Sequence, residues 1–181
     1  KVQKYLESSI FLLPLEQIND SIKENNWVKE IYLNTNYKDT LFIRIEEYKP
    51  IGIYYYNDNY FFFDENGKII DQTYITDFSN QSLIIFKGNS SNLKANSIIN
   101  ILKNNDFKKK YKIENLEFVN KRRWNINLYS DVKLLLSEED PNKSIQNFIK
   151  IQNKLSETDI NNIKTYDLRN LDKTILINLN D

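Results

Sequence analysis

Residues 25–50 read NNWVKEIYLNTNYKDTLFIRIEEYKP and contain two segments in which apolar residues recur at every second position. In the first segment Ile31 and Leu33 share one side of the chain, and in the second Leu41, Ile43 and Ile45 do the same. A period of two places alternate side chains on opposite faces, which is typical of half-buried antiparallel strands. The polar residues between the two segments supply a turn, so the stretch predicts a β-hairpin.

A helix is expected immediately before this hairpin. Pro14 can open it, because the N–H groups of a first helical turn have no intrahelical partner to lose. The apolar side chains of Leu15, Ile18 and Ile22 then recur at helical spacing and predict a buried stripe. Residues 2–7 are expected to be the tail of an earlier helix.

Pro50 marks a joint, because proline fixes its own φ angle and cannot donate to a strand ladder. We therefore expect one small domain over residues 1–49 and a second over residues 50–181. The second domain is predicted to contain two helices, one after the caps at residues 89–92 and one that begins at Asp140-Pro141. The expected strands are 51–56, 60–64, 69–70, 83–86, 113–118, 124–128, 132–136, 163–167 and 174–179, with residues 73–81 as a loop.

The composition excludes several kinds of chemistry. The chain of 181 residues has no cysteine and no histidine, which excludes disulfides, thiol nucleophiles, histidine bases and the common zinc sites. Its three glycines do not form a phosphate-binding loop, and its formal net charge of zero gives no reason to expect a nucleic-acid partner. We expect no cofactor and no metal. No run of about 20 apolar residues occurs, and the absence of methionine indicates a fragment whose membrane anchor would lie before Lys1.

Three clusters have both a functional and a structural interpretation. Glu138-Glu139-Asp140 could serve a carboxylate-dependent hydrolase, but acidic residues also favour the start of the next helix. The basic runs 108–110 and 121–123 could meet a membrane surface or an acidic partner, although solvated lysines are commoner. The aromatic residues of 54–63 could form a stacking platform, but without a basic groove we expect a core with one exposed face.

The last predicted strand is a candidate interaction site. Residues 174–179 read TILINL, are prone to form a strand, and contain neither a proline nor a central charge. Such residues normally protect an exposed sheet edge from pairing with another chain. If the strand lies at an edge, its backbone groups can pair with a guest strand.

Several motifs, taken in order along the chain, resemble the extracytoplasmic part of the FtsQ/DivIB cell-division family. The resemblance rests on Trp27-Val28, on Asp39-Thr40-Leu41 leading into residues 47–51, on the Asn-Gly hairpin of residues 63–69, on residues 83–88, on Arg123-Trp124 with the strands of 125–136, and on Tyr166-Asp167-Leu168-Arg169. Asn26, Ile85 and Asn170 depart from the family's usual residues. The family's fold is α+β, with a small POTRA domain of helices on a short antiparallel sheet, followed by a mostly antiparallel β domain. The first POTRA strand is expected before Lys1.

The resemblance implies a non-enzymatic scaffold that binds FtsB and FtsL and helps to control septal peptidoglycan synthesis. It also implies a single-pass inner-membrane protein with this part in the periplasm, and further divisome contacts through the POTRA domain. The partner-binding residues that we predict are Arg122, Arg123, Asn170, Leu171, Asp172, Lys173, Thr174, Ile175, Leu176, Ile177 and Asn178. The alternatives are a POTRA-containing component of outer-membrane assembly or secretion and, with less support, the hydrolase.

Overall fold

The computed structural model describes residues 9–74, 76 and 83–178. The chain divides into two compact units, unit 1 with residues 1–49 and unit 2 with residues 50–181. The predicted helical tail at residues 2–7, much of the predicted loop before residue 83, and Leu179 lie outside the described residues.

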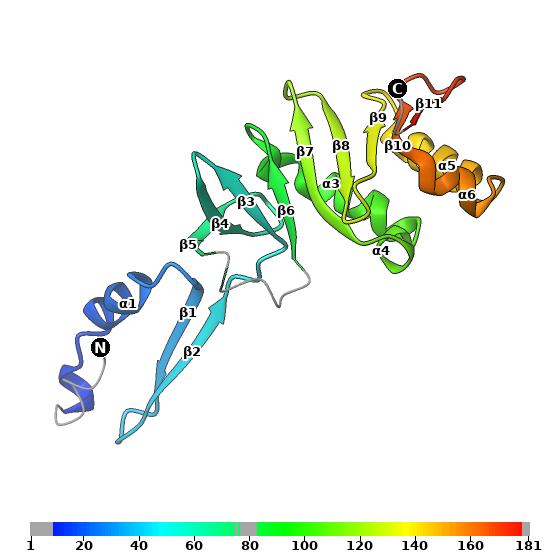
Figure 1. Ribbon diagram of the computed structural model, residues 1–181. Helices are drawn as coiled ribbons and strands as arrows, with labels where there is room; N and C mark the ends of the chain where they lie inside the picture. Colours follow the sequence, from blue (N-terminus) through cyan, green and yellow to red (C-terminus); the bar gives the residue numbers. More distant parts are fainter. Residues whose placement is uncertain (1–8, 75, 77–82, 179–181) are drawn as a thin grey trace. The chain divides into compact units, whose positions relative to one another are not determined.

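Unit 1 consists of a helix packed on a two-stranded hairpin in its described part (Figure 1). A 3-10 turn, η2 (Ile10–Leu12), precedes helix α1 (Leu15–Lys23), which is followed by β1 (Val28–Thr35) and β2 (Leu41–Glu47). The two strands pair antiparallel, with Ile31 opposite Ile45 and Leu33 opposite Ile43. The predicted helix and hairpin are therefore present.

The predicted burial in unit 1 is correct for β1 and wrong for two other segments. Burial alternates along β1, but Ile43 and Ile45 of β2 are exposed, because α1 packs mainly against β1. In α1 the side chain of Ile18 is fully buried, whereas Leu15 at the start of the helix is exposed. Of the predicted stripe, Ile18 is therefore fully buried, Ile22 is half-buried and Leu15 is exposed.

Unit 2 is built on one nine-stranded sheet in the order β11-β10-β9-β8-β7-β6-β3-β4-β5. Five of the eight junctions are antiparallel, and the junctions β3–β6, β6–β7 and β9–β10 are parallel. The predicted α+β class with a mostly antiparallel second unit is therefore confirmed. The strands are β3 (Gly52–Tyr56), β4 (Asn59–Phe63), β5 (Ile69–Thr73), β6 (Ile84–Lys87), β7 (Ile113–Val119), β8 (Arg123–Leu128), β9 (Lys133–Leu136), β10 (Ile163–Leu168) and β11 (Ile175–Asn178).

Four described helices of unit 2 lie in crossovers between parallel strands. The two predicted helices are present as α3 (Ser91–Asn104) and α5 (Pro141–Gln152), and the short helices α4 (Phe107–Lys110) and α6 (Glu157–Asn162) were not predicted. Helices α3 and α4 connect β6 to β7, and helices α5 and α6 connect β9 to β10. A parallel pair cannot be joined by a tight hairpin and needs such a crossover, which returns the chain across the sheet.

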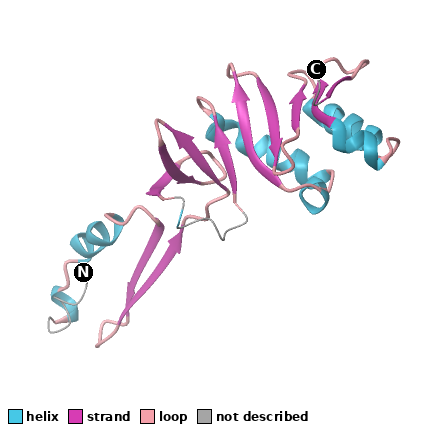
Figure 2. Cartoon of the chain, in the orientation of Figure 1, coloured by secondary structure: helices cyan, strands magenta, loops and turns pink. Residues whose placement is uncertain are grey.

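The helices cover one face of the sheet (Figure 2), and side chains alternate between that core face and the opposite face. The register aligns Phe86, Leu116, Ile126, Leu134 and Tyr166 across five neighbouring strands, and all five are fully buried against the helices. The residues next to these five in sequence form a second, more polar row on the opposite face of the sheet. That row runs Lys87, Glu117, Asn125, Leu135, Asp167 and Ile175.

Candidate partner-binding site

Strand β11 forms one edge of the nine-stranded sheet, as the sequence predicts. It pairs antiparallel with β10 on one side, and no strand of the described chain pairs with its other side. Leu176 lies opposite Tyr166 and packs against the core, which fixes the strand to the sheet. Ile175 and Ile177 project from the other face and remain 52% and 40% exposed. Backbone groups and two β-branched side chains are therefore available along this edge.

An open groove of about 1010 Å³ adjoins the beginning of β11 and gathers most of the predicted site residues. It is lined by Arg122 from the β7–β8 turn, by Arg123 at the start of β8, by residues 170–173 and by Ile175. Thr174, Leu176, Ile177 and Asn178 do not line it. The groove also contains residues that were not predicted as site residues: Ser137, Glu138, Glu139, Lys143, Asp167 and Arg169.

The turn before β11 is held in place by side-chain hydrogen bonds. The Oδ1 atom of Asn170 accepts hydrogen bonds from the N–H groups of Asp172 at 2.9 Å and Lys173 at 3.2 Å. This local arrangement is the reason that asparagine favours turns. From helix α5, Asn147 donates to the carbonyl of Leu171 at 3.1 Å. The departure from the family's usual residue at position 170 therefore has a structural role in shaping the turn.

A bidentate ion pair lies on the groove wall beside this turn. The guanidinium of Arg169 donates from Nε to Oδ1 of Asp167 at 2.8 Å and from Nη2 to Oδ2 at 2.5 Å. These hydrogen bonds lower the pKa of Asp167 and raise that of Arg169. Asp167 is 8% exposed and lies opposite Ile175 of the edge strand. An Asp-x-Arg spacing on a predicted strand could have identified the pair, because residues i and i+2 share a face.

The two predicted arginines have different surroundings. Arg122 is half exposed and forms an ion pair with Glu138, with 3.6 Å between Nε and Oε2. Arg123 donates to Oδ1 of Asn125 at 2.8 Å, and the amide of Asn125 in turn donates to Glu117 at 3.0 Å. Exposed ion pairs are weak, so Arg122 can exchange its partner at low cost, whereas Arg123 belongs to a network on the sheet.

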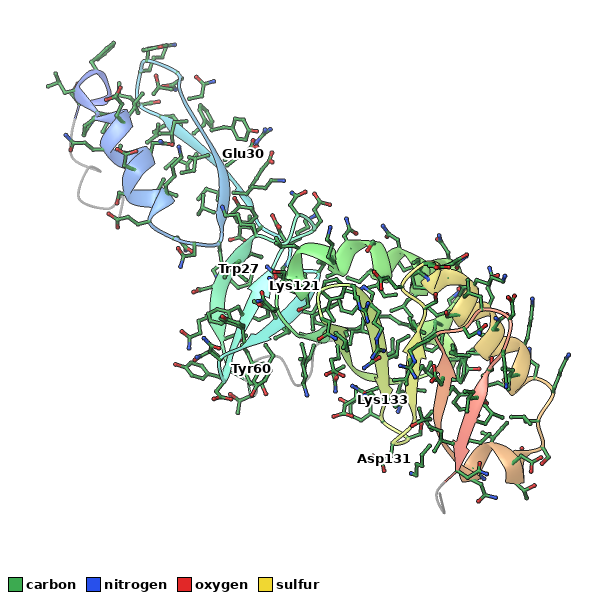
Figure 3. The ribbon with its side chains drawn as sticks, turned by 90° about the horizontal axis from the view of Figure 1, so that it is seen from above. Trp27, Glu30, Tyr60, Lys121, Asp131 and Lys133 are labelled. Carbon is green, nitrogen blue, oxygen red and sulfur yellow. The ribbon has the colours of Figure 1, made fainter. Side chains whose placement is uncertain are left out.

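That network continues across the polar row of the sheet. The ammonium of Lys133, labelled in Figure 3, lies 3.3 Å from Oε2 of Glu117. The hydrogen bond from Asn125, together with the charges of Lys133 and Lys87, lowers the pKa of Glu117. In the polar row, the charge of Glu117 is therefore balanced by Lys133 of the same face. In the groove beside β11, by contrast, the exposed Arg122 could leave Glu138 and pair with a residue of a partner protein.

Two side chains of the acidic run 138–140 make structural contacts. Asp140 caps helix α5, because its Oδ1 accepts from the backbone N–H of Lys143 at 2.8 Å. Glu138 faces Arg122, as described above. In the described part of the chain, no group of three or more acidic side chains is arranged to hold a metal ion. These contacts favour the structural interpretation of the run.

The Asp167–Arg169 pair gives an expected pH dependence. Because the folded-state pKa of Asp167 is lowered, its contribution to stability is present above the unfolded pKa of about 3.9 and is lost as pH falls through the folded value. Asp167→Asn is expected to lower the free energy of unfolding at pH 7 by about 1–2 kcal/mol, because it removes a charged hydrogen bond that solvent partly screens. Urea unfolding of both proteins between pH 7 and pH 2.5 measures this difference, which should shrink below pH 4. A constant difference over that range would contradict the assignment.

Together these features define an α+β chain with a small POTRA unit followed by a sheet unit that ends in an open edge strand. None of the described helices combines the length and apolar character needed to cross a bilayer. The family model for the FtsQ-type POTRA domain matches residues 1–48, and the model for the C-terminal part of cell division protein FtsQ/DivIB matches residues 53–169. The chain therefore belongs to the FtsQ/DivIB family.

Curated relatives agree with this assignment. The chain is 30% identical over 166 residues to cell division protein FtsQ of Rickettsia typhi and 30% identical over 171 residues to that of Rickettsia bellii. Each alignment covers 92% of this chain and 60% of the relative, so the chain spans less than two thirds of their length. Membership of this family supports a role in cell division.

Proposed function

We propose that this part of the protein is a non-enzymatic scaffold of the division machinery that binds FtsB-like and FtsL-like proteins by strand addition at β11. The full protein would be anchored in the inner membrane by one helix, with the described units in the periplasm at the septum. Through these partners it would help to control septal peptidoglycan synthesis. The POTRA unit would serve other divisome proteins.

The observation that carries this proposal is the contrast between the two edges of one sheet. At the β5 edge, Asp71 places a charge in the middle of the strand, and its Oδ1 accepts from the backbone N–H of Gln72 at 2.9 Å. The edge strand β5 also has an extra residue, Ile70, in its register with β4, whereas the register shift beside β11 lies in the inner strand β10. Charges and bulges of this kind protect an edge from pairing. Strand β11, with the sequence ILIN, contains none of these protective features within its own residues.

The same edge indicates what a guest strand would contain. Guest residues that lie beside Ile175 and Ile177 would be apolar, because cross-strand neighbours on one face pack together. A guest residue near Arg122 or Lys173 would be acidic, since both cations line the groove. Each new main-chain hydrogen bond would contribute about 0.5–1.5 kcal/mol, so the affinity of a short paired segment would also depend on the apolar and charged side chains that it places beside β11.

Proline substitutions at successive positions of β11 test strand addition. Neighbouring residues in a strand direct their N–H groups to opposite sides, so Ile177→Pro and Leu176→Pro remove donors on opposite edges of the strand. We expect Ile177→Pro or Ile175→Pro to abolish binding of the purified periplasmic part of the FtsB-like protein, measured by calorimetry, while circular dichroism shows a folded chain. Gln72→Pro on the β5 edge is the matched control and should leave binding unchanged, because the Gln72 N–H bonds to the side chain of Asp71.

Two results would decide against the proposal. Full affinity in folded proline variants at all three positions 175–177 would show that the β11 backbone does not pair with the partner. Loss of affinity in the β5 control would indicate that the partner binds at the β5 edge instead. In contrast, a loss of binding confined to β11 variants supports strand addition.

The alternatives have less support. A POTRA component of outer-membrane assembly or secretion is disfavoured because the matching model is the FtsQ-type POTRA domain. A carboxylate-dependent hydrolase is disfavoured because Asp140 caps a helix and Glu138 pairs with an arginine.

A further inference from the structure

A second hollow lies at the opposite end of the strands from the β11 groove. Two adjoining hollows of about 180 Å³ and 370 Å³ share Tyr111, Leu128 and Ser130. They lie where β8 ends and β9 begins, beside helices α4 and α6. Asp131, labelled in Figure 3, stands in the turn between these two strands. We call this region the basal hollow.

The inner part of the basal hollow combines apolar side chains with the polar side chains of Gln152 and Asn161. Val132, Phe148, Ile160 and Ile163 line it, and the ring of Tyr111 meets that of Phe148 with centroids 5.1 Å apart. At about 180 Å³ it is smaller than the roughly 300–1,000 Å³ of typical small-molecule sites. The inner part therefore has room for one bulky side chain but not for a long acyl chain.

The rim of the basal hollow is cationic. Lys110 and Lys112 line the outer part, and Lys164 lines the inner part. No aspartate or glutamate of the described chain lines either part, and the nearest ion pair is a long contact of 3.9 Å between Lys164 and Asp131. Lys109, by contrast, has its charge compensated by Asp106 at 2.8 Å.

The turn before β9 adds an exposed aromatic side chain to this rim. Tyr129 at the edge of the hollow is 70% exposed, although its backbone is fixed by a hydrogen bond to the carbonyl of Lys112 at 3.1 Å. Tyrosine is among the residues enriched at protein–protein interfaces, and anchor side chains bind there in well-packed pockets.

We propose that the basal hollow is a second docking site, which takes an acidic peptide segment of a protein partner and inserts one bulky apolar side chain of that segment. The apolar side chain occupies the inner part, and carboxylates on either side of it meet Lys110, Lys112 and Lys164. The small volume of the inner part favours such a segment over the acyl chain of an anionic lipid. This site is independent of strand addition, because it lies at the other end of β8, β9 and β10 from the groove.

A titration with defined peptides tests the site. The probe is acetyl-Glu-Asp-Phe-Glu-amide added to the ¹⁵N-labelled 181-residue chain, with amide chemical shifts as the readout. We expect shifts at Tyr111, Ser130 and Lys164. The neutral peptide acetyl-Gln-Asn-Phe-Gln-amide should bind about threefold to tenfold more weakly, as expected for a few exposed ion pairs. The peptide acetyl-Glu-Asp-Ala-Glu-amide, which lacks the anchor, should give no saturable shifts.

Paired variants separate the pocket from general surface charge. Asn161 lines the inner part and is exposed, so Asn161→Trp should fill the pocket and remove binding, whereas Asn162→Trp, one residue away, should not. Lys112→Glu should weaken binding of the acidic peptide, whereas Lys94→Glu on helix α3 should leave it unchanged.

Three outcomes would overturn the proposal. They are equal binding of the acidic and neutral peptides, shifts that map outside the basal hollow, and binding of phosphatidylglycerol vesicles without binding of the peptide. The last outcome would assign the lysines to a membrane surface. Ile177 lies outside the hollow, so the effect of Ile177→Pro on binding of the FtsB-like partner tests strand addition independently of these three outcomes.

Discussion

Gly88→Ala is expected to destabilise unit 2 by about 3–5 kcal/mol. Gly88 ends strand β6 with a φ angle of +96°, and a Cβ atom there would lie 2.3 Å from the carbonyl oxygen of Phe118. That oxygen belongs to β7, which pairs with β6 near the middle of the sheet. Alanine would therefore strain the backbone and also force two central strands apart. The loss is a large part of the roughly 5–15 kcal/mol that stabilises a typical domain.

Urea unfolding followed by tryptophan fluorescence measures this loss, because Trp124 packs within the same core, 5.9 Å from the ring of Phe86. Asn89→Ala is the matched control, since its side chain is exposed at the next position, and it should change stability by no more than about 0.5 kcal/mol. Equal stability of the two variants would mean that β6 and β7 can separate at this point without cost.

The strands could be predicted from the sequence better than their order. Alternation and turn residues such as Asn66-Gly67 are local signals, so each strand of unit 2 lies close to its predicted range. The sheet order places β6 beside β3, although β4 and β5 lie between them in the chain. That pairing depends on contacts between distant segments, which no local period records. Helices α4 and α6 were missed because four to six residues are too few to show a helical period.

In the candidate site, too, local features could be predicted from the sequence and contacts between distant segments could not. The edge position of β11 followed from its terminal place in the chain and from its unprotected composition. The proximity of Glu138 to Arg122 was missed, because the groove forms only when β8, β9, β10 and the turn before β11 meet, whereas the Asp167–Arg169 pair had a local signal in its Asp-x-Arg spacing. The exposure of Leu15 and Ile45 was also missed, since periodicity states which residues share a face but not how much of that face is covered.

Phe148→Ala is expected to have the second large effect, a loss of about 3–5 kcal/mol, as for other buried aromatic truncations. Phe148 of helix α5 is 1% exposed, and its ring contacts those of Phe107, Tyr111 and Tyr166 at centroid distances of 5.8, 5.1 and 4.9 Å. Removing the ring would leave a cavity where α4, α5 and β10 meet. Phe148→Leu retains much of the volume and should cost less than Phe148→Ala, so it serves as the control.

The consequence of Phe148→Ala should be largest at the edge strand, because α5 holds that edge in place. The hydroxyl of Ser144 donates to the carbonyl of Leu168 at 3.0 Å, and Asn147 donates to that of Leu171 at 3.1 Å. A loosened α5 would therefore release the end of β10 and the turn that leads into β11. Amide hydrogen exchange in Phe148→Ala should accelerate more in β10 and β11 than in β3 and β4, which pack away from α5. Uniform acceleration over the sheet would instead mean that unit 2 opens only as a whole, and that the partner-binding edge has no local dependence on α5.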